Sequence, residues 1–329
     1  MSVDVEKIEL SLPEGSAAHM SKGSLARYRA FMQREPLGAH SDWHQVDAYK
    51  ARLVQLDMSL LGKFHALTMS VFWPHRPADL ALPLQVGSGW LALDEIDRPL
   101  SSAMGVPCGD DFAILGLMAT TPRLQAYGSG SRLLRRILKK QAGRDLRLVA
   151  TRQGYPLYQV AGFANAGLVH QHQGIARAVR PPQPVPGVHI RPFAPSDMAA
   201  LDALDLHAYG ASRKTILRSL DTVSDVIVAE RRGSVEGFAM SRPFGKGRVI
   251  GPLVAEQGDV AMMLAAEFFQ AHAGTFLRLD TIVEDEAFEA FVSSAGLSVF
   301  NIATDMRLGR LRRALTGPQT FALAMQALG

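Results

Sequence analysis

The sequence carries a candidate anion-binding loop at residues 122–131, which read PRLQAYGSGS. Glycines at 128 and 130 allow the backbone to turn tightly and to approach a ligand without a clash at Cβ. A helix is expected to begin directly after the loop. Its first free N–H groups, together with the helix dipole, attract negative charge. The loop is therefore predicted to hold a phosphate or a pyrophosphate.

Other interpretations of this loop can be compared with its residues. A nucleoside-triphosphate loop needs Gly-Lys-Ser or Gly-Lys-Thr after the glycines, and the sequence has Gly-Ser-Gly-Ser instead. A dinucleotide fingerprint needs three glycines spaced G-x-G-x-x-G, whereas the spacing here stops at G-x-G. Glycine pairs also occur in ordinary turns, so the loop taken by itself leaves a purely structural role open.

The segments on either side of the loop are those that such a site requires. Residues 112–122 form an apolar strand that stops at a proline. Residues 129–142 predict an amphipathic helix with a basic face and with Gly143 as its C-cap. From Arg123 to Arg152 the chain has nine Lys or Arg residues and one acid, Asp145. This excess would attract an anion, although such charge runs are more often a solvated helix face.

The order of predicted elements occurs twice, on either side of a proline-rich segment at residues 180–187 that favours an extended connector. The chain is therefore predicted to divide into residues 1–179 and 188–329, two copies of one mixed α/β unit. The first copy has strands expected at 5–12, 88–96, 99–106, 112–122, 146–151 and 166–175, and helices at 42–70, 129–142 and 156–162. The second has strands expected at 188–193, 224–232, 237–244, 248–255, 276–283 and 298–309, and helices at 196–210 (with Ser196 as N-cap), 259–274 and 284–297. The tail from Arg310 can be a strand or a helix.

Composition narrows the class of protein. With 329 residues, 47% of them apolar, the chain can fill two cores. It has no run of about 18 apolar residues, so no membrane span is expected. Its early acidic residues argue against a signal peptide. The single cysteine, Cys108, favours a reducing compartment and a cytoplasmic location. The net charge of +4 and the few aromatic residues near the basic segment argue against a nucleic-acid binder.

Two motifs together resemble those of the GNAT superfamily of acetyltransferases. Residues 125–130, QAYGSG, fit that superfamily's Q/R-x-x-G-x-G/A signature, after the expected strand and at the start of the expected helix. Residues 146–163 resemble its next strand and short helix, with Tyr158, Gly162 and Phe163 in the corresponding places. The specific motifs cover residues 60–175, and the element order extends the resemblance over 188–309. The chain thus resembles the bacterial tandem GNAT proteins, which implies two domains that each have a mostly antiparallel sheet flanked by helices.

The resemblance implies acetyl-coenzyme A as co-substrate and assigns roles to residues. Tyr158 would protonate the departing thiolate, although an ordinary core tyrosine is the alternative. Thr120 and Thr151 stand where the family often has valine and asparagine, so the fine geometry of coenzyme binding is open. Backbone groups of Leu117, Met118, Ala119 and Thr120 would pair with the pantetheine amides. Loop amides of Gln125, Ala126, Tyr127, Gly128, Ser129, Gly130 and Ser131 would take the pyrophosphate.

A general base must take a proton from the attacking amine. Asp111, with its neighbour Asp110, precedes a strand near the expected site, and His75 lies in a segment where the family places substrate contacts. A solvated carboxylate and a packed histidine are the ordinary alternatives. His170 and His172 alternate along one strand and share a face. No third ligand of suitable spacing is evident, so no metal is predicted.

In the second half, residues 256–259, EQGD, replace the glycine-rich loop, and Asp259 would oppose a phosphate. One coenzyme per chain is therefore expected. Arg213 and Arg242 can contact a substrate carboxylate, although structural arginines are commoner. The predicted function is transfer of an acetyl group to a primary amine of a small molecule, by direct attack in a ternary complex. A non-catalytic acyl-coenzyme A sensor is the alternative. Neither nucleic acid nor a membrane is expected as partner, and the amine and the oligomeric state stay open.

Overall fold

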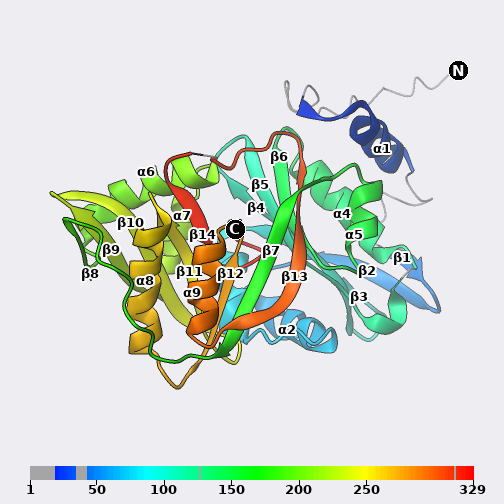
Figure 1. The fold of residues 1–329 in the computed structure, drawn as a ribbon. Helices are drawn as coiled ribbons and strands as arrows, with labels where there is room; N and C mark the ends of the chain where they lie inside the picture. Colours follow the sequence, from blue (N-terminus) through cyan, green and yellow to red (C-terminus); the bar gives the residue numbers. More distant parts are fainter. Residues whose placement is uncertain (1–18, 35–42, 126, 315) are drawn as a thin grey trace, which may run out of the picture.

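The computed structural model describes residues 19–34, 43–125, 127–314 and 316–329. Its strands form one continuous sheet with helices on both faces (Figure 1), which confirms the predicted mixed α/β class. The strands are β1 (Trp43–Val46), β2 (Tyr49–Gln55), β3 (Ser88–Leu93), β4 (Pro99–Cys108), β5 (Phe112–Thr120), β6 (Asp145–Ala150), β7 (Ala164–Ile175), β8 (Val188–Pro192), β9 (Asp225–Arg231), β10 (Ser234–Phe244), β11 (Gly247–Ala255), β12 (Phe276–Thr281), β13 (Ser298–Leu308) and β14 (Gln319–Ala322). The helices are α1 (Lys22–Gln33), α2 (Leu61–Ser70), α3 (Pro77–Val86), α4 (Ser129–Lys140), α5 (Tyr155–Val160), α6 (Met198–Tyr209), α7 (Lys214–Asp221), α8 (Gly258–Ala271) and α9 (Glu286–Ser294).

The two halves of the chain exchange one strand each, β7 and β13, at the centre of the sheet. The strand order runs β1-β2-β3-β4-β5-β6-β13-β7-β12-β11-β10-β9-β8. Strand β13, from the second half, lies between β6 and β7, and β7, from the first half, lies between β13 and β12 (Figure 1). The hydrogen bonds of the sheet therefore cross between the halves. The division at residues 180–187 stays a prediction about the two units.

The exchange is accompanied by a shared core. One cluster of buried side chains joins Phe64 and Leu67 of α2 to Tyr209 of α6, Leu217 of α7 and Phe238 of β10. Other apolar clusters lie under α4 in the first half and under α8 and α9 in the second. Because the shared cluster removes apolar area of both halves from water, it favours their association. No helix among the described residues is long and apolar enough to span a membrane.

The helix predicted over residues 42–70 is wrong in its first part. Residues 43–55 form the antiparallel pair β1 and β2, and α2 begins only at Leu61. Ala51 and Leu53 are buried, whereas Lys50 is exposed and Arg52 is half-buried, which is the two-residue alternation of a strand. Apolar residues in this segment are also spaced three and four positions apart, and this spacing led to the prediction of a helix.

Several element ends also differ from the predictions. Asp197, and not Ser196, is the N-cap of α6. Helix α4 ends with Gln141 as its C-cap, and Gly143 takes a left-handed conformation in the turn beyond it, with φ of 85°. Helices α1, α3 and α7 had no counterpart among the predicted elements. The strand expected at residues 5–12 lies outside the described residues.

The tail of the chain fills a gap in the second half of the sheet. Strands β11 and β12 pair in parallel only at Arg248–Val249 with Leu277–Arg278, and β14 then pairs antiparallel with β11. The Leu323 N–H donates to the Asp280 carbonyl of β12 at 2.9 Å. A Cβ at Gly251 would lie 1.9 Å from the Leu323 carbonyl oxygen, so only glycine admits the tail there. The tail is thus a strand that closes the space between β11 and β12.

Candidate active site

In the first half, the corresponding gap between two parallel strands stays open. Strands β5 and β6 pair only as far as Leu115 and Leu148. Just beyond, β5 bulges opposite β4, and Leu117 adopts a positive φ of 50°. The Ser102 hydroxyl donates to the Leu117 carbonyl at 2.7 Å and holds this conformation inside the protein. The bulge reorients the β5 backbone, so its later residues leave the ladder with β6.

A cleft of about 320 Å³ opens at this divergence. Residues of both halves of the chain line it. Ala327 of the tail forms part of its wall and packs closely against Gly116 of β5, where an added Cβ would lie 2.6 Å from the Ala327 side chain. The volume is in the range of small-molecule sites. The residues that line the cleft include Trp73, His75, Leu117, Met118, Thr151, Tyr158, Gln171, Gln173, Lys246, Arg278, Asn301 and Gln326.

The predicted anion loop leads into α4 as expected. Gly128 is the N-cap, with a left-handed φ of 85° that suits glycine. The first helical hydrogen bond runs from the Arg132 N–H to the Gly128 carbonyl, so the N–H groups of Ser129, Gly130 and Ser131 precede the helical ladder. The Ser129 hydroxyl lies 2.5 Å from that of Ser101 on β4 and anchors the turn.

The remaining loop residues hold the turn or face solvent. The Gln125 side-chain amide donates to the Thr120 carbonyl at 3.2 Å, and Tyr127 is 53% exposed. Ala119 is buried on β5. The predicted contact at Ala126 lies outside the described residues. The loop therefore joins the β5 divergence directly to the start of α4.

Part of the basic face of α4 has a structural use. The Arg135 guanidinium donates to the Phe31 carbonyl at 2.8 Å and lies 4.4 Å from the Phe31 ring centre. The Arg136 guanidinium lies 5.3 Å from the Trp90 ring centre. These contacts pack α4 against α1 and β3. The basic density seen in the sequence therefore serves the fold as well as any long-range attraction of an anion.

Tyr158 lies on α5 and lines the cleft while most of its side chain is buried. Its ring packs edge-on against Phe163, with ring centres 6.0 Å apart. Burial raises the pKa of the Tyr158 phenol well above its ordinary value, because the charged form loses solvation. The phenol therefore carries its proton at neutral pH and can donate it into the cleft.

His75 lines the same cleft. Its ring lies between Trp73 and Phe244, edge-on to both, with ring centres 5.7 and 5.6 Å away. Burial, and then the charge of Arg278, lower the pKa of His75 from 6.5 to about 4. The imidazole is neutral at physiological pH, so it can accept a proton.

The lowered pKa of His75 predicts a pH dependence of stability. Between about 4 and 6.5, the unfolded state binds a proton that the folded state does not, so the free energy of unfolding falls as pH falls. The slope from one such group is at most about 1.4 kcal/mol per pH unit. Burial also lowers the pKa of His44, which likewise makes the free energy of unfolding fall as pH falls. His75→Gln should flatten the slope in denaturant unfolding across this interval. Equal slopes for the parent and the variant would contradict the argument.

Asp111 lies apart from Tyr158 and His75. It is not among the residues that line the cleft, and it precedes the opposite end of β5. Its carboxylate pairs with Arg312 at 2.8 Å and Arg310 at 3.3 Å, and the hydrogen bond from Arg312 holds the pKa of Asp111 below its ordinary value. The structure therefore brings together Tyr158 and His75, and gives Asp111 an ion-pair role.

The two arginines considered for substrate contacts hold the tail. Arg213 is fully buried, pairs with Asp205 at 2.5 Å and donates to the Leu328 carbonyl at 3.2 Å. Arg242 donates to the Ala324 carbonyl at 2.9 Å.

Sequence reasoning missed Gln171, Gln173, Asn301 and Arg278, which line the cleft. Alternation along β7 places both glutamines on the face opposite His170 and His172, but only the strand exchange shows which face meets the cleft.

Comparisons with known proteins agree with this geometry. Residues 201–317 match the family model described as "Acetyltransferase (GNAT) domain". The chain is 26% identical over 212 residues to the uncharacterized N-acetyltransferase YitH of Bacillus subtilis, covering 63% of this chain and 74% of that protein. A candidate acetyltransferase from Pyrococcus horikoshii has a similar fold, with a TM-score of 0.70 and 21% identity over 87% of this chain and 99% of that one. A tandem GNAT protein from the clavulanic acid biosynthesis pathway has a TM-score of 0.58 and 13% identity over 79% of this chain and 98% of that one.

The fold, the open divergence between β5 and β6 and these similarities define an acyltransferase. The family match over residues 201–317, the Bacillus subtilis relative and the fold all support a GNAT-superfamily acetyltransferase, in agreement with the loop and helix motifs of the sequence. The residues that match the family model belong to the second half, which lacks the glycine-rich loop. The second half therefore keeps the family's sequence pattern outside the loop.

Proposed function

We propose that the protein transfers an acetyl group from acetyl-coenzyme A to a primary amine of a small molecule, by direct attack in a ternary complex. One observation carries the proposal: the β5–β6 divergence at Leu117 opens into a cleft that Tyr158 and His75 both line. The start of α4 lies beside this cleft, since a Cβ at Gly130 would meet the Leu157 side chain at 3.4 Å. Leu157 is the chain neighbour of Tyr158.

The backbone supplies the proposed coenzyme contacts. Residues 117–120 of β5, released from the ladder with β6, offer N–H and C=O groups for the pantetheine amides. The N–H groups of Ser129, Gly130 and Ser131 at the start of α4 take the pyrophosphate. Since these donors are main-chain groups, threonine at positions 120 and 151 does not remove them.

The side chains supply the proton transfers. The amine nitrogen attacks the acetyl carbonyl carbon, and the carbon–sulfur bond then breaks as the tetrahedral intermediate collapses. Tyr158 gives its proton to the departing thiolate, and His75 takes the proton that the nitrogen loses, directly or through water. At neutral pH the tyrosine is protonated and the histidine is neutral, which are the states that these two roles require.

The proposal is tested by turnover. The untagged chain is incubated with acetyl-coenzyme A and a panel of small primary amines, thiol release is followed, and acetylated products are identified by mass. Amine-dependent thiol release supports the proposal. Tight coenzyme binding without release for any amine would favour the alternative, a non-catalytic acyl-coenzyme A sensor.

We predict that each chain binds one acetyl-coenzyme A. In the second half, β14 fills the gap between β11 and β12, and a Cβ at Gly258 would meet the Asp285 carboxylate at 2.8 Å. With Asp259 in the first turn of α8, two acids oppose a phosphate there. Calorimetric titration should saturate at one equivalent per chain. Saturation at two equivalents would overturn this interpretation of the second half.

A further inference from the structure

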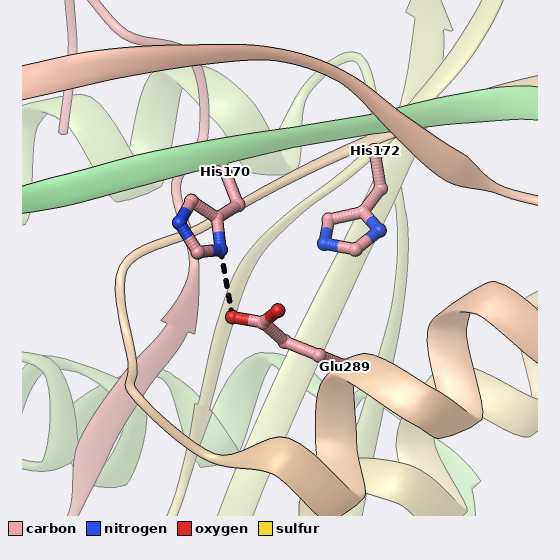
Figure 2. A group of neighbouring side chains, drawn as sticks. All are labelled: His170, His172 and Glu289. Carbon is pink, nitrogen blue, oxygen red and sulfur yellow. Dashed lines mark hydrogen bonds and ion pairs between the residues drawn. The ribbon is translucent and has the colours of Figure 1, made fainter.

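Three side chains with metal-binding groups meet on the face of β7 that is turned toward α9. They are His170 and His172 of β7 and Glu289 of α9 (Figure 2). One ligand atom from each lies within 4.8 Å of the other two. The third member of this group, Glu289, is 119 residues from His170 along the chain.

His172 has a ring nitrogen whose hydrogen-bonding capacity is unused. The side chain is fully buried, and its Nδ1 pairs with the Leu297 carbonyl oxygen at 3.1 Å. Its Nε2 is buried and has no hydrogen-bond partner among the residues that the structure describes. Figure 2 shows one ring nitrogen of His172 turned toward His170 and Glu289. Burying such a group without a partner costs free energy.

This hydrogen bond of His172 matches the usual surroundings of a metal-bound histidine. Such a histidine commonly donates one ring N–H to a backbone carbonyl, and this bond leaves the lone pair of the other nitrogen for the metal. With Nδ1–H donating to Leu297, the Nε2 lone pair is available on the side of the cluster. The tautomer that the metal needs is therefore the one that this carbonyl selects.

The other two ligands are open to solvent. His170 Nδ1 and Glu289 Oε1 lie 2.8 Å apart, and the two side chains are 25% and 26% exposed. A cation can therefore reach the cluster from solvent, and a water molecule can complete its coordination. Small rotamer changes of these two partly exposed side chains can close the remaining distances.

We propose that His172 Nε2, His170 Nδ1 and a Glu289 carboxylate oxygen bind a Zn²⁺ ion, with water as a fourth ligand. Two imidazoles and one carboxylate form an accepted zinc ligand set, with metal–ligand distances of about 2.0–2.2 Å. Imidazole nitrogens favour zinc over magnesium or calcium, which take oxygen ligands.

The ion would join the halves of the chain at the strand exchange. His170 and His172 belong to the last strand of the first half, and Glu289 to a helix of the second. On the opposite face of the same strand, Gln171 and Gln173 line the cleft. A zinc ion here would therefore fix β7 against α9 and hold the cleft wall in place, without touching the reacting atoms.

The test measures metal binding and does not depend on turnover. The untagged chain is stripped with a chelator and titrated with Zn²⁺ against a chromophoric competitor, and thermal unfolding is followed at each ratio. One equivalent per chain should bind and raise the unfolding temperature. Co²⁺ at the same site should show the visible absorption of a four-coordinate ion.

Variants decide whether the three residues are the ligands. His170→Gln and Glu289→Gln alter partly exposed side chains and should each weaken zinc binding by about tenfold or more. His172→Gln should do the same, but it changes a buried residue, so the other two variants carry the test if it fails to fold. The matched control is His189→Gln, because His189 Nε2 also lies near a carboxylate, 3.6 Å from Glu230 Oε1, but outside the cluster. The control should bind zinc like the parent. The proposal is overturned if the parent binds no stoichiometric zinc, or if folded His170→Gln and Glu289→Gln bind it equally well.

Discussion

Replacing Tyr158 with phenylalanine is expected to lower kcat by about 10²–10⁴-fold, the usual contribution of a positioned acid. The variant keeps the ring, its edge-on contact with Phe163 and its packing, but it has no proton to give to the thiolate. Coenzyme affinity should stay nearly unchanged, because the lost interaction forms mainly in the transition state.

The measurement uses the amine found in the turnover screen and compares kcat with the coenzyme Kd. Tyr155→Phe is a matched control. Tyr155 lies on the same helix and packs against the core without lining the cleft. This control should turn over at the parent rate. If Tyr158→Phe also does so, Tyr158 is a core residue and another acid or water protonates the thiolate.

Replacing Gly130 with glutamate is expected to abolish acetyl-coenzyme A binding while the protein stays folded. A Cβ at this position meets the Leu157 side chain at an ordinary 3.4 Å, so the backbone tolerates a side chain. The new carboxylate stands in the first turn of α4, where it repels a phosphate and occupies its place. Gly128 would be a poorer site for the test, because its φ of 85° strains any other residue.

Calorimetry measures the affinity, and thermal unfolding checks the fold. Gly62→Glu is the control, since Gly62 is exposed on α2 and a Cβ there meets nothing within 4 Å. It introduces the same charge away from the loop and should bind the coenzyme like the parent. Undiminished affinity in folded Gly130→Glu would remove the loop from the site.

Much of the fold around the cleft follows from local sequence patterns. The apolar strand before Thr120, the helix after Gly128 and the short helix of Tyr158 were all predicted from residues close together in the chain. The hairpin at residues 43–55 was missed, because a short strand with a few apolar residues also fits helical spacing. The pairing of Asp111 with Arg312 could not be predicted, since about 200 residues separate them.

The sequence by itself predicted the loop chemistry of each half and the resemblance to the GNAT superfamily. Glycine conformations and free helix N–H groups depend on a few neighbouring residues, so Gly128 and Gly130 predict an anion site, and Asp259 argues against one, without tertiary information. Only the tertiary structure decided that β7 and β13 change places, that the tail closes the second gap, and that Glu289 joins His170 and His172. These features rest on pairing between distant segments, and many registers of such pairing satisfy the same local pattern of apolar and polar residues.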